Sequence, residues 1–282
     1  IGRTLTAAGF SWTDVADAYD LEIRPAGQAF TGEPTHVLNS DPPFLITDLL
    51  PGQNYRFVVR ARCDLNEVSE WSNPYNFATE LNNIRPCPLL FDLRDTSCNA
   101  QVQIFKIHVN NAPGTSLGTD VNFTGLRLVV EHAWRSDLRI WLRSPDGTLV
   151  QVIGGLNAGD RNLGNPEAGD CAPFIELTEQ AGAQPLSTAA EKDNVTGLYL
   201  PFESFAPFAN GQNPNGIWQL EICDAKANDK GKLRACGLVF AGLGCDPPAG
   251  VMASNIDING ADISWTPDAS GDSILIEYGL AG

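Results

Sequence analysis

The stretch His132-Ala-Trp-Arg-Ser-Asp-Leu-Arg-Ile-Trp-Leu-Arg-Ser-Pro-Asp-Gly-Thr148 decides the fold of this chain. In its middle part, Leu138, Ile140 and Leu142 fall on one face and the residues between them fall on the other. This period of two predicts a half-buried β-strand. The segment Ser144-Pro-Asp-Gly147 then supplies a tight turn, because proline presets φ and glycine tolerates a positive φ. We therefore expect a strand, a turn and the start of another strand.

Three further segments lie downstream of this strand. They are Asn215-Gly-Ile-Trp-Gln-Leu-Glu-Ile-Cys-Asp224, Asn228-Asp-Lys-Gly-Lys-Leu233 and Cys236-Gly-Leu-Val-Phe240. Taken in order with the first stretch, they resemble the P domain (P/Homo B domain) of proprotein convertases and secreted bacterial subtilases. The resemblance implies a jelly-roll-like β-sandwich over residues 83–243, an accessory module that is not itself catalytic.

A repeat flanks this central region. Phe10-Ser-Trp-Thr-Asp-Val-Ala-Asp-Ala-Tyr-Asp-Leu-Glu-Ile23 and Ile263-Ser-Trp-Thr-Pro-Asp-Ala-Ser-Gly-Asp-Ser-Ile-Leu-Ile-Glu-Tyr278 share an apolar-Ser-Trp-Thr strand followed by a second alternating strand. Tyr55, just after Leu50-Pro-Gly52, has the position of a tyrosine corner, in which the hydroxyl ties the corner backbone. Both copies resemble a fibronectin type III domain.

We predict an all-β chain of serial β-sandwiches. A fibronectin type III domain with its first strand missing spans 1–82, the P-domain sandwich spans 83–243, and a partial fibronectin type III domain spans 244–282. Either the sequence is a window on a longer multidomain chain, which we favour, or strands are exchanged between copies. Within the central region, 154–206 is expected to form a long irregular loop or to hold a short helix near 187–193.

Composition supports this class. The 282 residues include 27 Gly and 19 Pro and only 18% charged residues, a mix that suits short strands and many turns. The net charge of −16 repels nucleic acid and anionic lipid and attracts divalent cations. No apolar run is long enough to span a bilayer, so we expect no membrane span.

Seven cysteines with one methionine indicate an oxidising, extracellular or cell-surface location. The disulfide candidates are Cys63, Cys87, Cys98, Cys171, Cys223, Cys236 and Cys245. Cys223 and Cys236 flank an expected hairpin and are candidates for a cross-strand bond, although sequence alone does not fix the connectivity. In bacterial modules of the fibronectin type, a cysteine before the first strand can meet one that ends the sixth. That resemblance implies partners for Cys63 and Cys245 beyond the two ends of this sequence.

Oxygen-rich loops predict a calcium site. The expected hairpin turn 224–231 contains Asp224 and Asp229, a second acidic loop contains Asp160, and Asp137 is a further candidate ligand. Calcium takes six to eight oxygen ligands, often from loops. The alternative is that these residues serve only as turn formers.

Two aromatic residues, Trp134 and Trp141, are candidates for binding a surface glycan, because sugars bind exposed aromatics that lie beside polar groups. Trp141 is equally a candidate for burial beneath the opposite sheet. His132 and Asp137 raise the alternative of a serine-protease site, but the chain lacks the Gly-Thr-Ser-Met-Ala nucleophile segment, and the resemblance assigns both residues a structural role.

We therefore expect a non-catalytic structural or adhesive segment of a large secreted or cell-surface protein, as in Bacteroidota-like bacteria. Its expected partners are other domains of the same chain, a surface glycan or protein ligand, and further copies that form a fibre. The alternative is a stabilising accessory region of a secreted subtilisin-like protease whose catalytic domain lies outside this chain.

Overall fold

The computed structural model shows a chain that is nearly all β, as predicted. Short 3-10 turns are the only helical elements within the described ranges. The structure describes residues 2–39, 42–63, 67–83, 89–94, 98, 102–154, 161–167, 172–189, 193–226, 229–242, 249–254 and 262–266.

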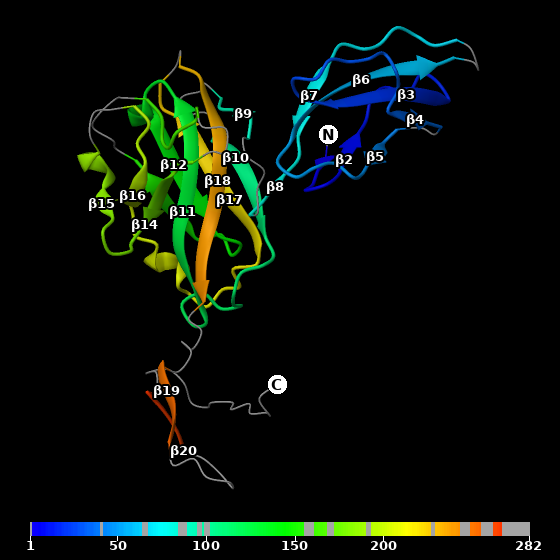
Figure 1. Cartoon of the computed structure of the whole chain (residues 1–282). Helices are drawn as coiled ribbons and strands as arrows, with labels where there is room; N and C mark the ends of the chain where they lie inside the picture. The colour runs from blue at the N-terminus through cyan, green and yellow to red at the C-terminus, as the bar shows by residue number, and fades with distance from the viewer. Residues whose placement is uncertain are drawn as a thin grey trace.

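The N-terminal part is a sandwich of two antiparallel sheets (Figure 1). One sheet has the order β1-β2-β5, from Gly2–Arg3, Ala8–Phe10 and Phe44–Ile46. The other has the order β4-β3-β6-β7, from His36–Leu38, Ala18–Pro25, Asn54–Arg62 and Tyr75–Ala78. Strand β1 pairs with β2, where a first strand of the sandwich would lie.

Aromatic rings fill this first core. The ring of Phe10 meets those of Phe57 and Phe77 edge-on, with centroids 4.8 and 5.3 Å away. The hydroxyl of Tyr55 accepts a hydrogen bond from the backbone N–H of Leu50, at 2.9 Å. The predicted tyrosine corner is thereby confirmed.

The central part is a larger sandwich, seen in green to orange in Figure 1. Its five-stranded sheet has the order β13-β12-β17-β10-β8, from Leu149–Ile153, Leu138–Arg143, Gly216–Asp224, Gln103–Val109 and Leu81–Asn82. Its six-stranded sheet has the order β15-β16-β14-β11-β18-β9, from Gln184–Pro185, Gly197–Leu200, Ile175–Thr178, Val121–His132, Gly231–Gly242 and Phe91–Asp92.

The pattern in the opening stretch predicted the core of this sandwich correctly. Leu138, Ile140 and Leu142 are fully buried, and the residues between them are half-buried. Trp218, from the neighbouring strand β17, is also fully buried and stacks on Phe123 of the opposite sheet with ring centroids 5.3 Å apart. These contacts place the main core between β12 and β17 on one side and β11 and β18 on the other.

Two expectations about the central region are wrong. The expected irregular loop at 154–206 is wrong, because the segment contains three strands, β14, β15 and β16, that extend the six-stranded sheet; the alternative of a short helix near 187–193 is matched in part by the 3-10 turn Leu186–Thr188. The segment after Asp224 joins β17 to β18, but these strands lie in opposite sheets and do not form a hairpin. The alternation of apolar residues in β17 and β18 predicts which face of each strand is buried. The same alternation occurs whether two consecutive strands pair in one sheet or lie in opposite sheets.

The segment between the two sandwiches is built into both sheets of the second one. β8 pairs in parallel with β10 at Ile107 and His108. The side chain of Asn83 then hydrogen-bonds both backbone groups of Leu238 on β18, at 3.0 and 2.7 Å. Further along, β9 pairs with β18. This segment therefore closes one open side of the sandwich.

A carboxylate reinforces the joint. Glu80, the residue before β8, contacts the Nε2 atom of His108 at 2.6 Å and the Nζ atom of Lys106 at 3.1 Å. Its backbone N–H donates to Thr4 of the first sandwich at 3.0 Å. Asn54 of the first sandwich also hydrogen-bonds the carbonyl of Leu90. Glu80 thus bonds both sandwiches at once.

The C-terminal part is described only as a hairpin of β19 (Ala249–Ser254) and β20 (Asp262–Thr266). Most of the predicted domain at 244–282 lies outside the described residues, and the three domain boundaries stay predictions.

Candidate functional site

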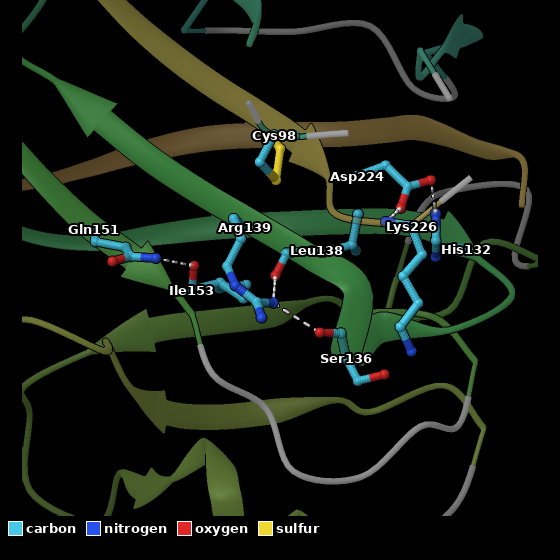
Figure 2. Close-up of a disulfide and its surroundings, with 10 residues drawn as sticks. Cys98, His132, Ser136, Leu138, Arg139, Gln151, Ile153, Asp224 and Lys226 are labelled. Atoms are coloured by element: carbon cyan, nitrogen blue, oxygen red, sulfur yellow. Dashed lines mark hydrogen bonds and ion pairs between the residues drawn. A yellow bond between two sulfur atoms is a disulfide. The ribbon is translucent and has the colours of Figure 1, made fainter. Parts of the chain in front are cut away.

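Three of the predicted site residues, Trp134, Asp137 and Asp224, lie at one corner of the central sandwich. Here β11 ends at His132, the 3-10 turn η1 (Arg135–Asp137) follows, and β12 begins at Leu138. The end of β17 lies alongside, because Leu138 pairs with Asp224. Figure 2 shows His132, Asp224 and Lys226 together, with Cys98 beside the end of β17, to which its disulfide joins it.

His132 is the buried centre of this corner, with 1% of its surface exposed. Its Nε2 atom lies 3.0 Å from Oδ2 of Asp224, and its Nδ1 atom lies 3.1 Å from the backbone nitrogen of Trp134. The Nδ1 atom also lies 2.9 Å from the carbonyl oxygen of Trp134, so both ring nitrogens have polar partners. The backbone N–H of His132 donates to Asn162 at 2.9 Å. Every polar group of the ring is therefore used.

A glycine makes room for this histidine. A Cβ atom at Gly231 would lie 2.5 Å from Cδ2 of His132 and 2.9 Å from the carbonyl oxygen of Glu131. These distances are too short for real atoms, so a side chain at this position of β18 would displace the ring. Gly231 therefore allows β18 to pass close to His132.

The two carboxylates at this corner each contact basic or amide groups. Asp224 accepts from His132 and from the backbone N–H of Lys226 at 3.1 Å. Asp137 contacts the Nζ atom of Lys226 at 3.3 Å and accepts from the Ser136 hydroxyl at 3.3 Å. Asp137 and Asp224 thus lie at the same corner, where they are partners of Lys226 and His132.

The calcium prediction stays a prediction. Within the described ranges, no group of three or more His, Cys, Asp or Glu side chains is placed to hold a metal ion. Asp229 lies two residues before β18 and has no side-chain hydrogen bond there, while Asp160 lies outside the described residues.

The corner has a histidine–carboxylate pair, and none of the described residues supplies the third member of a hydrolytic triad. No described hydroxyl or thiol hydrogen-bonds to His132, and the Ser136 hydroxyl contacts Asp137 instead. A nucleophile must lie within hydrogen-bond reach of its base. The arrangement of these described residues supports a structural role for His132.

The two candidate glycan-binding tryptophans differ in exposure. Trp134 has 51% of its surface exposed, and its backbone is fixed by His132. Trp141 is half-buried on β12, two residues from Arg143, which pairs with Glu221 at 2.7 Å. Trp134 therefore presents the more accessible ring.

The structure contains the disulfide Cys98–Cys223, which ties the segment before β10 to the end of β17 (Figure 2). The suggested Cys223–Cys236 bond is therefore wrong. Its basis was a hairpin, whereas Cys236 lies on β18 in the other sheet. Cys63 is exposed and has no disulfide partner in the described part of the chain, and Cys236 is buried. Cys87, Cys171 and Cys245 lie outside the described residues.

Sequence reasoning missed the role of Asp146 in the turn after β12. The Ser144 hydroxyl donates to it at 2.6 Å, and Thr148 and Asn210 donate as well. The Ser144 bond, with the others in support, lowers the pKa of Asp146 to about 2. Asp146 therefore ties the turn to the segment after η3 (Ala206–Phe208). The Ser-Pro-Asp-Gly-Thr motif is the available signal, because it puts a hydroxyl on each side of the carboxylate.

Comparison with protein-family models and with curated proteins finds no match to this chain. Among the described elements, no helix has the length and hydrophobicity needed to cross a membrane.

Proposed function

We propose that this chain is a non-catalytic structural and adhesive segment of a large secreted or cell-surface protein. In this proposal its modules are fibronectin type III-like, P-domain-like and again fibronectin type III-like. The observation that carries the proposal is the joint between the first two sandwiches. A spacer must hold its modules at a fixed separation, whereas a flexible linker lets them move independently.

The joint has the contacts that stiffness requires. At the two ends of the connecting segment, β8 pairs with β10 and β9 pairs with β18. Asn83, just after β8, hydrogen-bonds Leu238 of β18. The Glu80 contacts with His108 and Lys106 are half-exposed and contribute little each, so the two Asn83–Leu238 hydrogen bonds and the strand pairing supply most of the rigidity. The Cys98–Cys223 disulfide favours an oxidising, extracellular location.

The proposal is tested by small-angle X-ray scattering and by double electron–electron resonance. The second method measures the distance between two spin labels, one in each sandwich. The wild type is expected to give one narrow distance distribution. The variant Glu80→Ala/Asn83→Ala should give a broader one, because it removes the side-chain contacts of the joint. The control Glu33→Ala/Asn39→Ala makes the same changes at exposed positions of the first sandwich and should match the wild type. A wild-type distribution as broad as that of the joint variant would contradict the proposal.

The sequence of the full-length gene would distinguish this proposal from the rival function, which is an accessory region of a secreted subtilisin-like protease. A subtilase domain upstream would favour the rival, and further sandwiches would favour the adhesive segment. Calcium and a surface glycan are proposed ligands within either function. For the glycan, binding on a glycan array should be lost in Trp134→Ala, and a wild-type protein that binds no glycan contradicts it.

A further inference from the structure

A pocket of about 290 Å³ lies at the end of the central sandwich where β11 begins. Its lining comes from the first residues of β11, from the turn after β14 and from the segment around η3. β11 has a bulge here, between Phe123 and Gly125, and a bulge bends its strand and redirects the side chains. The volume is close to the lower limit of roughly 300 Å³ for ligand pockets, so this pocket suits a small ligand.

Three phenylalanine side chains form the apolar side of the pocket. Phe123 meets the rings of Phe205 and Phe208 edge-on, with centroids 4.8 and 5.4 Å away. The three residues are only 8%, 3% and 1% exposed, so each ring is held by its neighbours. The apolar side is therefore preformed, and a ligand does not have to order it.

The polar side of the pocket consists of Asn122, Glu179 and Gln180. Asn122 is half-buried, and the other two are exposed. In the described structure, none of these three side chains forms a hydrogen bond or an ion pair. The hydroxyl of Thr124, by contrast, donates to the carbonyl of Val239 at 3.2 Å. Each of the three free side chains carries an oxygen that accepts hydrogen bonds, so the pocket offers three acceptor groups to a ligand.

The charge of the pocket is negative. Glu179 is the only charged residue among the described residues that line it. The whole chain carries a net charge of −16, which adds a long-range attraction for cations. The pocket is therefore complementary to a positively charged ligand that also has an apolar part.

We propose that this pocket binds a primary alkylammonium ion, which is an ammonium group on a short apolar body. The ammonium group has three N–H donors, and Asn122, Glu179 and Gln180 supply three acceptor groups. The alkyl part lies against the phenylalanine side chains. A hydrated metal ion would gain nothing from the apolar side, and a quaternary ammonium ion has no N–H to donate. The site lies within the central sandwich, so the proposal holds for an adhesive segment and for a protease accessory region alike.

NMR titrations at constant ionic strength test this proposal with three probes. They are n-butylammonium, tetramethylammonium, which has the charge but no N–H donor, and n-butanol, which has the apolar body but no charge. We expect n-butylammonium to bind with a Kd of about 10 mM or tighter, and at least about tenfold more tightly than either other probe. The amide signals of Thr124 and Gln180 should shift. No saturable binding of n-butylammonium up to about 100 mM, or equally tight binding of either other probe, would overturn the proposal.

Variants locate the binding. Glu179→Gln keeps the shape of the side chain and removes its charge, so it should weaken n-butylammonium about tenfold with an unchanged thermal midpoint. The control Glu167→Gln makes the same change at an exposed position outside the pocket lining and should bind like the wild type. Asn122→Leu removes one acceptor and should weaken n-butylammonium but not tetramethylammonium. Unchanged binding in Glu179→Gln, or an equal loss in Glu167→Gln, would refute the pocket as the site.

A fourth probe distinguishes two sources of the same ammonium group. Nα-acetyl-lysine N-methylamide carries it on a peptide backbone, as a lysine side chain of a partner protein does. Binding as tight as that of n-butylammonium supports the site with a lysine side chain as its ligand. Much weaker binding of the lysine derivative, with n-butylammonium still bound, supports the site with a free amine as its ligand.

Discussion

Removal of the Cys98–Cys223 disulfide in Cys98→Ala/Cys223→Ala should destabilise the central sandwich strongly. The bond joins residues 125 positions apart, so it restricts a long loop of the unfolded chain. The chain-entropy relation gives about 5 kcal/mol for a loop of this length, and measured values are typically about 2–4 kcal/mol. Because Cys223 is only 3% exposed, its truncation leaves a small cavity that adds to the loss.

Differential scanning calorimetry measures this effect. For a sandwich of this size, each kcal/mol lowers the melting temperature by roughly 2–4 °C, so a loss of about 2–5 kcal/mol corresponds to roughly 5–20 °C. Wild-type protein reduced with dithiothreitol should melt close to the double variant, and the difference between them reports the packing loss. The control Cys63→Ala removes an exposed thiol and should melt like the wild type. A double variant that melts within 1 °C of the oxidised wild type would refute the reasoning.

Four other outcomes are expected. Tyr55→Phe removes the hydrogen bond of the tyrosine corner and should lower the free energy of unfolding in urea by about 1 kcal/mol. The control Tyr75→Phe, at an exposed ring, should leave it unchanged, and equal losses in the two variants would contradict the role of the corner. Gly231→Ala should lower the melting temperature, because the new methyl group displaces the ring of His132; an unchanged value is the contrary result. Asp146→Asn should cost roughly 0.5 kcal/mol, since solvent screens this exposed turn. The pKa of Asp146 is lowered in the folded state, so the stabilisation that its carboxylate provides is complete above pH 3.8 and is lost as the pH falls through about 2. A stability difference between Asp146→Asn and the wild type that stays the same below pH 2 would disagree. If calcium binds the acidic loops, EGTA will lower the melting temperature, and an unchanged midpoint ends that proposal.

Local patterns in the sequence predicted the parts of the fold that depend on neighbouring residues. Alternation over Leu138–Leu142 identified a buried strand face, and Leu50-Pro-Gly52 before Tyr55 identified a tyrosine corner. Alternation failed for β14, because all four residues of Ile175–Thr178 are buried. A strand that is covered on both faces loses the period of two.

Pairings over long separations were not accessible from the sequence. His132 and Asp224 are 92 residues apart, and their contact depends on the register between β12 and β17. Asp224 was consequently interpreted as a calcium ligand, and its histidine partner was missed. The same limit explains the cysteines, since the pairing of Cys223 with Cys98 depends on β17 lying next to β10.

The stiffness of the joint depends on a short strand, because β8 has only two residues and pairs with β10 at Ile107 and His108. Glu80, the residue before β8, contacts Lys106 and His108, and its backbone N–H donates to the carbonyl of Thr4 in the first sandwich. Asn83, the residue after β8, hydrogen-bonds both backbone groups of Leu238 on β18. Because the Glu80 side chain is more exposed to solvent than these backbone groups, loss of the Asn83 side chain should broaden the distance distribution between the modules more than loss of the Glu80 side chain.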